Sequence, residues 1–316
     1  MNLKDASILI TGASGFVGRN LVELLRARGL RPITPTRAEC DLLEQEQIRR
    51  LLADEKPDIV FHAAGVVGGN LANRERPAEF HYKNLMMGAM LLHESWRAGV
   101  KKYVGLMGGC SYPAQAPNPI KETSLFHGPL HPDSAPYSHA KSMAFVQAEA
   151  YRRQYSFDAI ILVPGNLYGP YDNFELSGSH VIPALIRKYL AAKEENKPSV
   201  EAWGSGKPVR DFVYVTDACE AILLAAEKYS SPDLINISSG VPVTIKELTE
   251  TIAELTGYTG QVNWDATKPD GQMFKGYDVT RMKEVIGFQC HTSLRDGLKR
   301  TIDWYLANRK SGNVRS

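Results

Sequence analysis

Little in this chain points to disulfides, to metal binding or to a membrane. The 316 residues contain four cysteines, Cys40, Cys110, Cys219 and Cys290, and no two of them form a CxxC pair. Such spacing argues against a disulfide scaffold and against structural zinc. No stretch approaches the roughly eighteen apolar residues of a membrane span, and the first residues lead into a strand without an apolar signal region. We therefore expect a cytoplasmic protein that binds neither metal nor membrane.

An excess of charge of one sign is also lacking. The chain has 37 Lys and Arg against 35 Asp and Glu, a formal net charge of +2, and both signs are mixed along it. A nucleic-acid partner would call for a basic patch or run, which is missing. A small-molecule partner is favoured, and the chain is long enough to bury an ample core without disulfides.

Short β-rich runs alternate with helical patterns through the first half, as in "SILIT", "VGRNLVELLRARG", "RPITPT", "DIVFHAA", "KYVGLMG" and "DAIILVPGN". This alternation predicts an α/β fold with a doubly wound parallel sheet, the Rossmann arrangement. The pattern loosens beyond residue 170, which indicates a smaller C-terminal lobe. We predict a nucleotide-binding domain at 1–170, to which a segment near 205–240 returns, and a substrate-binding lobe at 171–316.

The segment "ILITGASGFVGRNL" places Gly12, Gly15 and Gly18 directly after an apolar strand and at the start of a helix. In this context glycines allow a tight turn, close approach to a pyrophosphate and close helix packing. The next strand ends in "ITPTRAECDL", which offers Arg37 and no acid at the strand end. Arg37 suits a ribose 2′-phosphate and so favours NADP over NAD, although it is also explained as a solvated surface arginine. Asp41 and Leu42 would flank the adenine.

The segment "PYSHAKSM" contains Tyr137 and Lys141, which lie one turn apart on the same face of a helix. A tyrosine of ordinary pKa, about 10, is too weakly acidic to react near neutrality. We expect the neighbouring ammonium to lower the pKa of Tyr137. A YxxxK pair alone is common by chance, but its place after the strands of a GxxGxxG sheet indicates catalysis.

These motifs, together with "HAA" and "PGNLYGPYDNF", resemble the extended short-chain dehydrogenase/reductase family. Within it the chain is similar to the GDP-L-fucose synthase group through "VGGNLAN" and "SHVIPALI", and the similarity runs over residues 5–305. The resemblance implies an NADPH-dependent epimerase/4-reductase of a 4-keto-6-deoxy nucleotide sugar, with a GDP sugar favoured. It also implies a homodimer, for which the apolar faces of "NLMMGAMLLHESW" and "AKSMAFVQAEAY" are suitable.

The resemblance also implies roles for single residues. Cys110 and His180 would exchange protons at the carbons beside the C4 ketone, and Tyr137 would protonate C4 oxygen when hydride arrives from the cofactor. The expected cofactor contacts are Gly12, Gly15, Phe16, Val17, Gly18, Arg37, Asp41, Leu42, Ala63, Ala64, Leu106, Gly108, Lys141, Pro164, Asn166, Leu167 and His180. The expected substrate contacts are Asn166, Lys188, Trp203, Arg210, Asp270 and Lys275, with the last two on the nucleotide side.

The chain departs from its relatives in "GLMGGCSYP". The superfamily usually carries Ser or Thr where Gly108 stands, and the following position is also glycine, Gly109. Strand alternation would place Gly108 and Cys110 on one face and Ser111 on the other, which makes Ser111 a poor substitute. Losing one donor to an oxyanion typically costs about 10²- to 10³-fold in rate. Another group fills the vacancy, the glycine makes room for a different sugar, or the reductive step is weak.

Two rival functions therefore stay open. The first is a 4-reductase or epimerase for a different nucleotide sugar, as in polysaccharide or antibiotic biosynthesis. The second is a catalytically idle NADP(H)-binding sensor, against which the presence of Tyr137, Lys141, Cys110 and His180 speaks.

Overall fold

A parallel sheet of five strands forms the centre of the larger lobe in the computed structural model, which describes residues 1–175, 178–268, 270–311 and 314. The spatial order is β1-β2-β3-β4-β8, and every neighbouring pair is parallel. The strands are β1 (Ile8–Thr11), β2 (Ile59–His62), β3 (Lys102–Leu106), β4 (Ala159–Pro164) and β8 (Ile235–Ile237). This sheet confirms the predicted α/β fold class.

The segment "RPITPT", predicted as a strand, forms only a single bridge beside β1. The amide of Ile10 donates to the carbonyl of Ile33 at 2.9 Å, and the amide of Ile33 donates to Ile8 at 2.7 Å. Pro32 and Pro35 lack the N–H groups that a longer ladder needs. The chain still passes to one side of β1 here and to the other side at β2, so the sheet has its topological switch point at β1.

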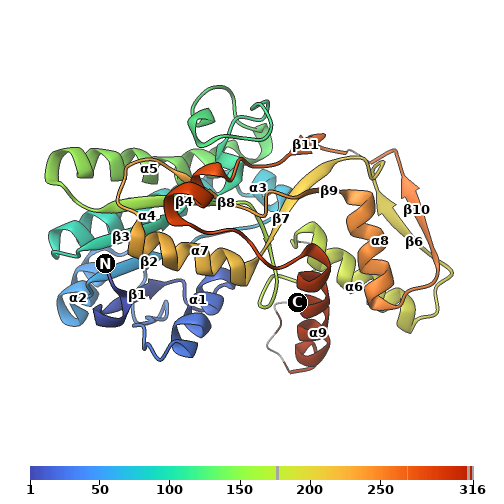
Figure 1. Cartoon of the computed structure of the whole chain (residues 1–316), viewed down its shortest axis with the longest axis horizontal. Coiled ribbons are helices and arrows are strands. Elements are labelled where there is room, and N and C mark those ends of the chain that lie inside the picture. Colours follow the sequence, from blue (N-terminus) through green and yellow to red (C-terminus); the bar gives the residue numbers. More distant parts are fainter. Residues whose placement is uncertain (176–177, 269, 312–313, 315–316) are drawn as a thin grey trace.

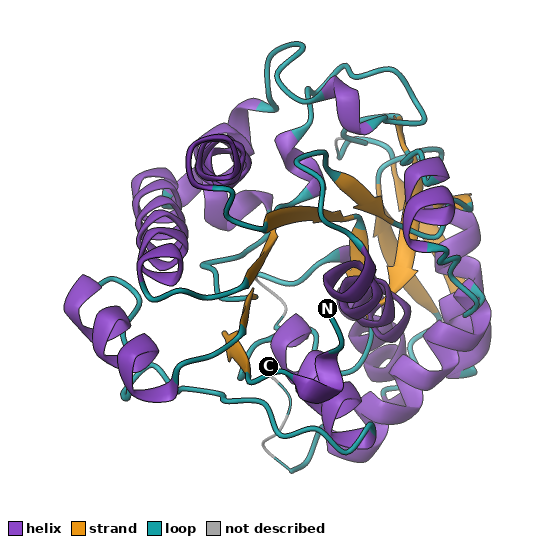
Figure 2. Ribbon diagram, turned by 60° about the vertical axis from the view of Figure 1, so that its left-hand side comes forward, coloured by secondary structure: helices purple, strands orange, loops and turns teal. Residues whose placement is uncertain are grey.

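Helices cover both faces of this sheet (Figures 1 and 2). On one face α1 (Phe16–Ala27) packs against α7 (Val215–Lys228) over an aliphatic core. On the other face lie α2 (Gln45–Glu55), α4 (Pro77–Arg97) and α5 (Ala135–Tyr155). The strands are mostly apolar because neither face meets water, and polar residues such as Lys102, Thr11 and His62 lie at strand ends.

The smaller lobe has its own core and two small sheets. One sheet contains β5 (Asn166–Tyr168), β7 (Val209–Tyr214), β9 (Pro242–Thr244) and β11 (Phe274–Lys275), and the other pairs β6 (Ser199–Trp203) with β10 (Gln261–Asp265). Helices α6 (Val181–Glu194), α8 (Ile245–Thr256) and α9 (Leu294–Asn308) pack on them. The remaining short elements are α3 (Asn70–Glu75), single 3-10 turns at Leu3–Asp5, Gly109–Ser111, Glu122–Ser124 and Pro132–Ser134, and a π turn at Met282–Ile286.

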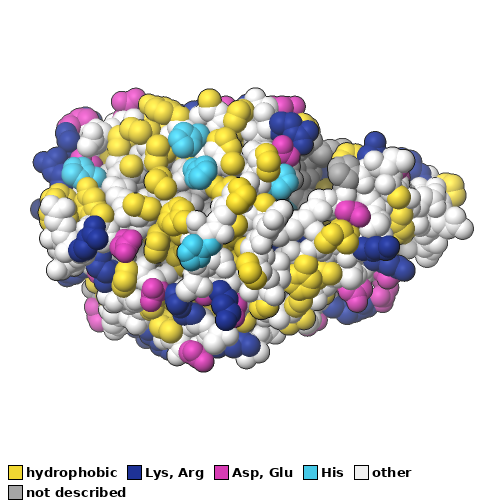
Figure 3. All heavy atoms as spheres, turned by 90° about the horizontal axis from the view of Figure 1, so that it is seen from above, with side chains coloured by type: hydrophobic (Ala, Val, Ile, Leu, Met, Phe, Trp, Pro, Cys, Tyr) yellow, Lys and Arg dark blue, Asp and Glu magenta, His cyan; other side chains and the backbone are white. Residues whose placement is uncertain are grey.

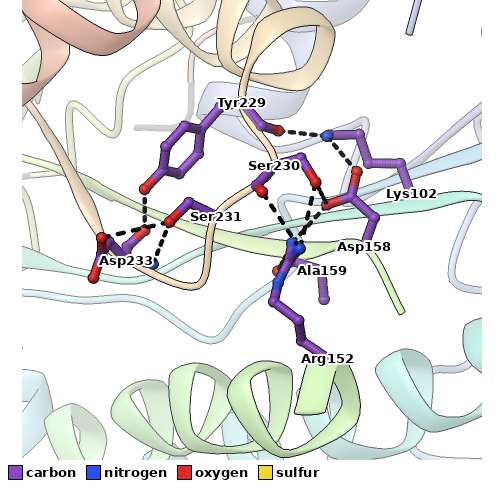
Figure 4. A network of polar contacts seen from close by, with 8 residues as sticks. All are labelled: Lys102, Arg152, Asp158, Ala159, Tyr229, Ser230, Ser231 and Asp233. Atoms are coloured by element: carbon purple, nitrogen blue, oxygen red, sulfur yellow. Dashed lines mark hydrogen bonds and ion pairs between the residues drawn. The ribbon is translucent and has the colours of Figure 1, made fainter. Parts of the chain in front are cut away.

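A polar network ties the amino ends of β3 and β4 together (Figure 4). The ammonium of Lys102, which is 2% exposed, donates to the Asp158 carboxylate at 2.7 Å and to the Tyr229 carbonyl at 2.5 Å. Arg152 adds a contact of 2.6 Å to the same carboxylate. Burial alone would raise the pKa of Asp158, but the hydrogen bonds and charges of Lys102 and Arg152 lower it overall. The buried lysine of this edge is therefore fully partnered.

Among the helices of the described residues, none combines the length and apolarity that crossing a membrane requires.

Candidate active site

The glycine turn after β1 has the geometry expected of a pyrophosphate site. Gly12 has a φ of +71°, and a Cβ there would lie 2.6 Å from the Ala64 Cα. A Cβ at Gly18 would lie 2.7 Å from the carbonyl carbon of Gly12, so α1 can approach the turn only because this residue is glycine. Gly15 caps α1, whose first turn contains Phe16 and Val17. Free amide groups at this helix start suit a phosphate.

Arg37 and Asp41, which are expected to contact the adenosine part of the cofactor, lie beside each other. The Arg37 side chain is 76% exposed, and its guanidinium lies 3.1 Å from the Asp41 carboxylate. A hydrogen bond from the Leu43 amide lowers the pKa of Asp41, and Arg37 adds to that effect. Leu42 is buried. Arg37 is thus accessible to a 2′-phosphate, which would have to compete with Asp41 for it.

The other predicted cofactor residues lie along the carboxyl edge of the sheet. Ala63 and Ala64 follow β2, Leu106 ends β3, Pro164 ends β4, and Asn166 and Leu167 form β5. The parallel strands bring these positions to the side where dinucleotides bind in such folds. The structure therefore gathers at one edge residues that the sequence separates by more than a hundred positions.

His62, the last residue of β2, is buried at this edge and was not among the predicted site residues. Its Nδ1 and the Thr11 hydroxyl lie 2.9 Å apart. Burial lowers the pKa of His62 to about 3, and the charge of Lys141 contributes. The imidazole is thus neutral at working pH and locks β1 to β2 below the predicted reactive groups. The "HAA" motif contained this signal, but only the contact with Thr11 gives it a role.

Tyr137 and Lys141 lie on the first two turns of α5. Burial raises the pKa of Tyr137, and nearby Cys110 adds to the rise, so the expected lowering by Lys141 is wrong for this arrangement. Burial lowers the pKa of Lys141 to about 8. No ion pair or hydrogen bond in the described part of the chain satisfies its ammonium. With His62 and Gln147, Lys141 lines a small cavity.

The strand leading to Cys110 ends earlier than the alternation argument assumed. β3 stops at Leu106, and Gly109–Ser111 form a 3-10 turn, so alternation does not set the faces here. A Cβ on Gly108 would nevertheless lie 3.3 Å from Cys110 Sγ and 3.8 Å from the Tyr137 hydroxyl. The Ser111 hydroxyl instead donates to the Ser138 carbonyl at 3.2 Å in the interior. A hydroxyl is thus absent from the side of this turn that faces Tyr137.

Two cations of the smaller lobe lie at the same end of the site as Cys110. Lys275 on β11 and Arg210 on β7 are register partners of a parallel pair, so they lie side by side. Burial lowers the pKa of both, and nearby Cys110 counteracts the lowering for Lys275. Lys275, predicted on the nucleotide side, therefore lies at the reactive end, where positive charge stabilises a thiolate or an oxyanion.

His180 stands at the start of α6 and does not touch the Cys110 and Tyr137 side chains within the described residues. Its side chain is 54% exposed, and Nδ1 lies 4.0 Å from the carboxylate of buried Asp172. Asp172 raises the pKa of His180 and so favours the imidazolium. Asp172, in the "PYDNF" segment, is a positioning residue that the motif analysis did not single out.

The remaining predicted substrate residues lie in the smaller lobe. Lys188 donates to the Glu201 carbonyl, and Trp203 is 68% exposed with the Lys268 ammonium 5.7 Å from its ring centroid. Asp270 accepts hydrogen bonds from the Ser205 amide at 2.6 Å and hydroxyl at 2.7 Å, and these bonds lower its pKa. Asp270 thus shapes the turn at 204–206 as well as facing outward.

No three His, Cys, Asp or Glu side chains gather in a way that would hold a metal ion within the residues described.

A doubly wound sheet with a glycine turn, and a tyrosine and lysine pair beside it, defines a dinucleotide-dependent enzyme of the short-chain dehydrogenase/reductase type. Residues 8–238 match the model of the NAD dependent epimerase/dehydratase family. The chain belongs to this family, which confirms the predicted membership.

Comparison with individual relatives shows which members of the family this chain is similar to. GDP-L-fucose synthase 1 of Arabidopsis thaliana is 40% identical over 309 residues, which are 98% of this chain and 95% of the relative. The NADP-bound GDP-L-fucose synthetase structure from Naegleria fowleri has a TM-score of 0.90 and 25% identity, and the match covers 99% of this chain and 97% of that chain. The GDP-6-OMe-4-keto-L-xylo-heptose reductase of C. jejuni has a TM-score of 0.88 and 31% identity, with 96% and 98% covered.

Proposed function

We propose that this protein is an NADPH-dependent epimerase/4-reductase that acts on a GDP-4-keto-6-deoxy sugar, and its likeness to proteins named GDP-L-fucose synthase supports the proposal. The observation that carries the proposal is the meeting of Tyr137, Lys141 and Cys110 with Arg210 and Lys275 at the carboxyl edge of the sheet. Acid, base and cations are the groups that both reactions require.

NADP is the proposed cofactor, and bound NADPH would supply the hydride for C4. The glycine turn of Gly12, Gly15 and Gly18 would hold the pyrophosphate, and Arg37 the 2′-phosphate. Residues 1–170, with the 205–240 segment, would form the cofactor domain, and 171–316 the substrate lobe. The relative with bound NADP supports this assignment.

Epimerisation begins when the Cys110 thiolate removes a proton from a carbon beside the C4 ketone. The C–H electron pair moves into an enolate, whose negative oxygen lies by the Tyr137 hydroxyl and the Lys141 ammonium. His180, protonated with the help of Asp172, returns a proton to the opposite face of that carbon. Cys110 then gives up its proton as His180 regains one, so atoms and charge balance.

In the reduction Tyr137 is the proton donor. A phenol that stays protonated can donate its proton to the C4 oxygen as hydride arrives there, which forms the alcohol. The Lys141 ammonium, unpaired in the described residues, would bind the nicotinamide ribose and stabilise the phenolate left behind. Arg210, Lys188, Trp203, Asn166, Asp270 and Lys275 are the proposed substrate contacts.

A second candidate is a 4-reductase of another GDP-4-keto sugar. It is favoured by the glycine at 108, which leaves room beside Tyr137, and by the likeness to a GDP-4-keto-heptose reductase. The two candidates share cofactor and reactive groups and differ in the sugar and in the need for epimerisation.

Incubation with NADPH and GDP-4-keto-6-deoxymannose in deuterated water tests the proposal. We expect oxidation of NADPH and a product that carries deuterium at C3 and C5. Reduction without deuterium at these carbons would support the second candidate. Binding of NADPH without turnover of the sugar would support a sensor. Cys110→Ser, which keeps size but loses the readily ionised thiol, should abolish deuterium incorporation, whereas Cys290→Ser should not.

The homodimer and the cytoplasmic location stay predictions. Hydrophobic side chains are numerous on the face seen in Figure 3, which includes the outer sides of α4 and α5. Tyr82 on α4 and Val146 on α5 are 59% and 42% exposed. A two-fold axis between the helix pairs of two copies would cover both, because an isologous interface buries the same patch twice. Sedimentation equilibrium would measure the mass.

A further inference from the structure

Tyr277 lies just after β11 and is held rigidly although it belongs to no strand. The Ile120 amide donates to the Gly276 carbonyl at 2.9 Å, and the Asp278 amide donates to the Ile120 carbonyl at 2.9 Å. The Asn236 side-chain amide bonds the carbonyls of Ile120 and Asp278 at 2.9 Å and 3.1 Å. Tyr277 is therefore clamped on both sides and is only 4% exposed.

The Tyr277 ring occupies room that two glycines leave free. A Cβ on Gly109 would lie 2.0 Å from the Tyr277 hydroxyl and 2.7 Å from Cζ. A Cβ on Gly165 would lie 3.1 Å from Tyr277 Cε2, although the Ser238 hydroxyl is nearer to it, at 2.6 Å. Neither glycine has a positive φ, so backbone conformation does not require them. The absence of a side chain at Gly109 is thus explained by the phenol that lies against it.

The Tyr277 hydroxyl is beside the reactive end of the site. Burial raises the pKa of Tyr277, and nearby Cys110 is the next cause of the rise, so the phenol keeps its proton at neutral pH. The other hydroxyls of the 108–112 segment are engaged, since Ser111 donates to the Ser138 carbonyl and Tyr112 donates to the Asn236 side chain at 2.6 Å. The Tyr277 hydroxyl makes no hydrogen bond with any residue that the structure describes.

We propose that the Tyr277 hydroxyl donates a hydrogen bond to an oxygen of the sugar bound against Cys110 and so supplies the donor that Gly108 and Gly109 lack. This inference rests on the proposed function, because it assumes a sugar in contact with Cys110. Tyr277 would act together with Tyr137: one phenol transfers a proton, and the other holds the sugar.

Tyr277→Phe removes the oxygen and leaves the ring between the glycines. We expect kcat/KM for the GDP-4-keto sugar to fall about 10-fold, because one hydrogen bond to the substrate is lost. The midpoint of urea unfolding should stay unchanged, since the hydroxyl has no partner among the described residues. The matched control is Tyr258→Phe, which also removes a mostly buried phenolic oxygen but in the smaller lobe, where it donates to the Lys197 carbonyl at 3.2 Å. It should leave kcat/KM unchanged.

Rescue separates a donor role from a packing role. A serine at 108 would place its Cβ 3.8 Å from the Tyr137 hydroxyl, so Gly108→Ser combined with Tyr277→Phe should restore kcat/KM to within about 3-fold of wild type. An unaffected Tyr277→Phe variant, or a loss that Gly108→Ser does not repair, would overturn the inference. Failure of the wild-type protein to turn over any GDP-4-keto sugar would instead refute the proposed function, so the two failures are distinguishable.

Discussion

Lysine side chains are buried or partly buried at both edges of the parallel sheet, but only one edge provides them with partners. At the amino edge Lys102 binds the Asp158 carboxylate and a main-chain carbonyl. At the carboxyl edge Lys141 and Lys275 have neither an ion pair nor a hydrogen bond in the described residues, and burial lowers the pKa of both.

This difference in hydrogen bonding indicates that the charge of Lys102 is structural, whereas the charges of Lys141 and Lys275 are available to a ligand. An unpartnered ammonium away from water lowers the stability of the folded state, so it is retained where a bound group will use it. Lys102 has no such use, because its hydrogen bonds are filled by the protein itself. Cations that are withdrawn from solvent and unpaired therefore mark the binding site better than exposed cations such as Lys101, Arg295 and Lys299, which lie in surface pairs.

The largest effect is expected at the unpartnered lysine. Lys141→Met should lower kcat/KM for reduction by about 10³-fold, because the ammonium that stabilises the reacting tyrosine is lost. The free energy of unfolding should stay the same or rise, since no partner is abandoned. Initial rates and urea titration measure the two. A loss of stability as large as that of Lys102→Met would remove the distinction between the edges.

Lys102→Met should instead lower stability and leave activity unchanged. We expect the free energy of unfolding to fall by about 2 kcal/mol, because Asp158 loses one of its two cations and the Tyr229 carbonyl loses its donor. The folded fraction should keep its kcat. Lys101→Met is the matched control: Lys101 pairs with Asp58 at 2.8 Å but is 67% exposed, so it should change stability by less than about 0.5 kcal/mol. Equal effects of the two substitutions would show that the network is not structural.

The two neighbouring glycines test whether packing also distinguishes the carboxyl edge. Gly109→Ala would force a methyl group into the Tyr277 phenol and should cost about 1–3 kcal/mol of stability. At Gly108 the nearest contact of a Cβ is Cys110 Sγ at 3.3 Å, so Gly108→Ala should cost less than about 1 kcal/mol. Thermal unfolding of both variants measures this. Equal costs would contradict the placement of Tyr277.

The smallest effect is a difference in pH dependence. Because the pKa of Lys141 is lowered to about 8, its ammonium fraction falls above that pH, and kcat/KM should decline up to about 10-fold per unit there. The folded pKa of Asp158 is lowered, so the stability it contributes is present above its unfolded pKa of about 4 and is lost only in acid. Because the folded pKa of Lys141 lies below its unfolded value of about 10.4, stability should stay level or rise from about pH 8 to 10, the range in which activity declines. An activity profile flat to pH 10 would contradict the role of Lys141.

Much of the fold and part of the site could be predicted because the signals are local. The alternation of strands and helices predicted the sheet, and the spacing of Gly12, Gly15 and Gly18 predicted the turn that the structure contains. The strand expected at "RPITPT" failed because Pro32 and Pro35 limit it to one bridge. The lowered pKa expected for Tyr137 is wrong because burial, which the YxxxK spacing does not reveal, raises the pKa of this phenol.

The sequence by itself determined which residues share a turn or a helix face, because backbone periodicity places Tyr137 and Lys141 together whatever the rest of the chain does. Only the tertiary structure decided what lies beside Cys110. Lys275 and Tyr277 arrive there through the pairing of β11 with β7 and the bridge to Ile120. Such contacts depend on how distant segments pack, and neither composition nor periodicity records them. The glycine at position 109 of "GLMGGCSYP" is therefore explained by Tyr277, a residue more than 160 positions further along the chain.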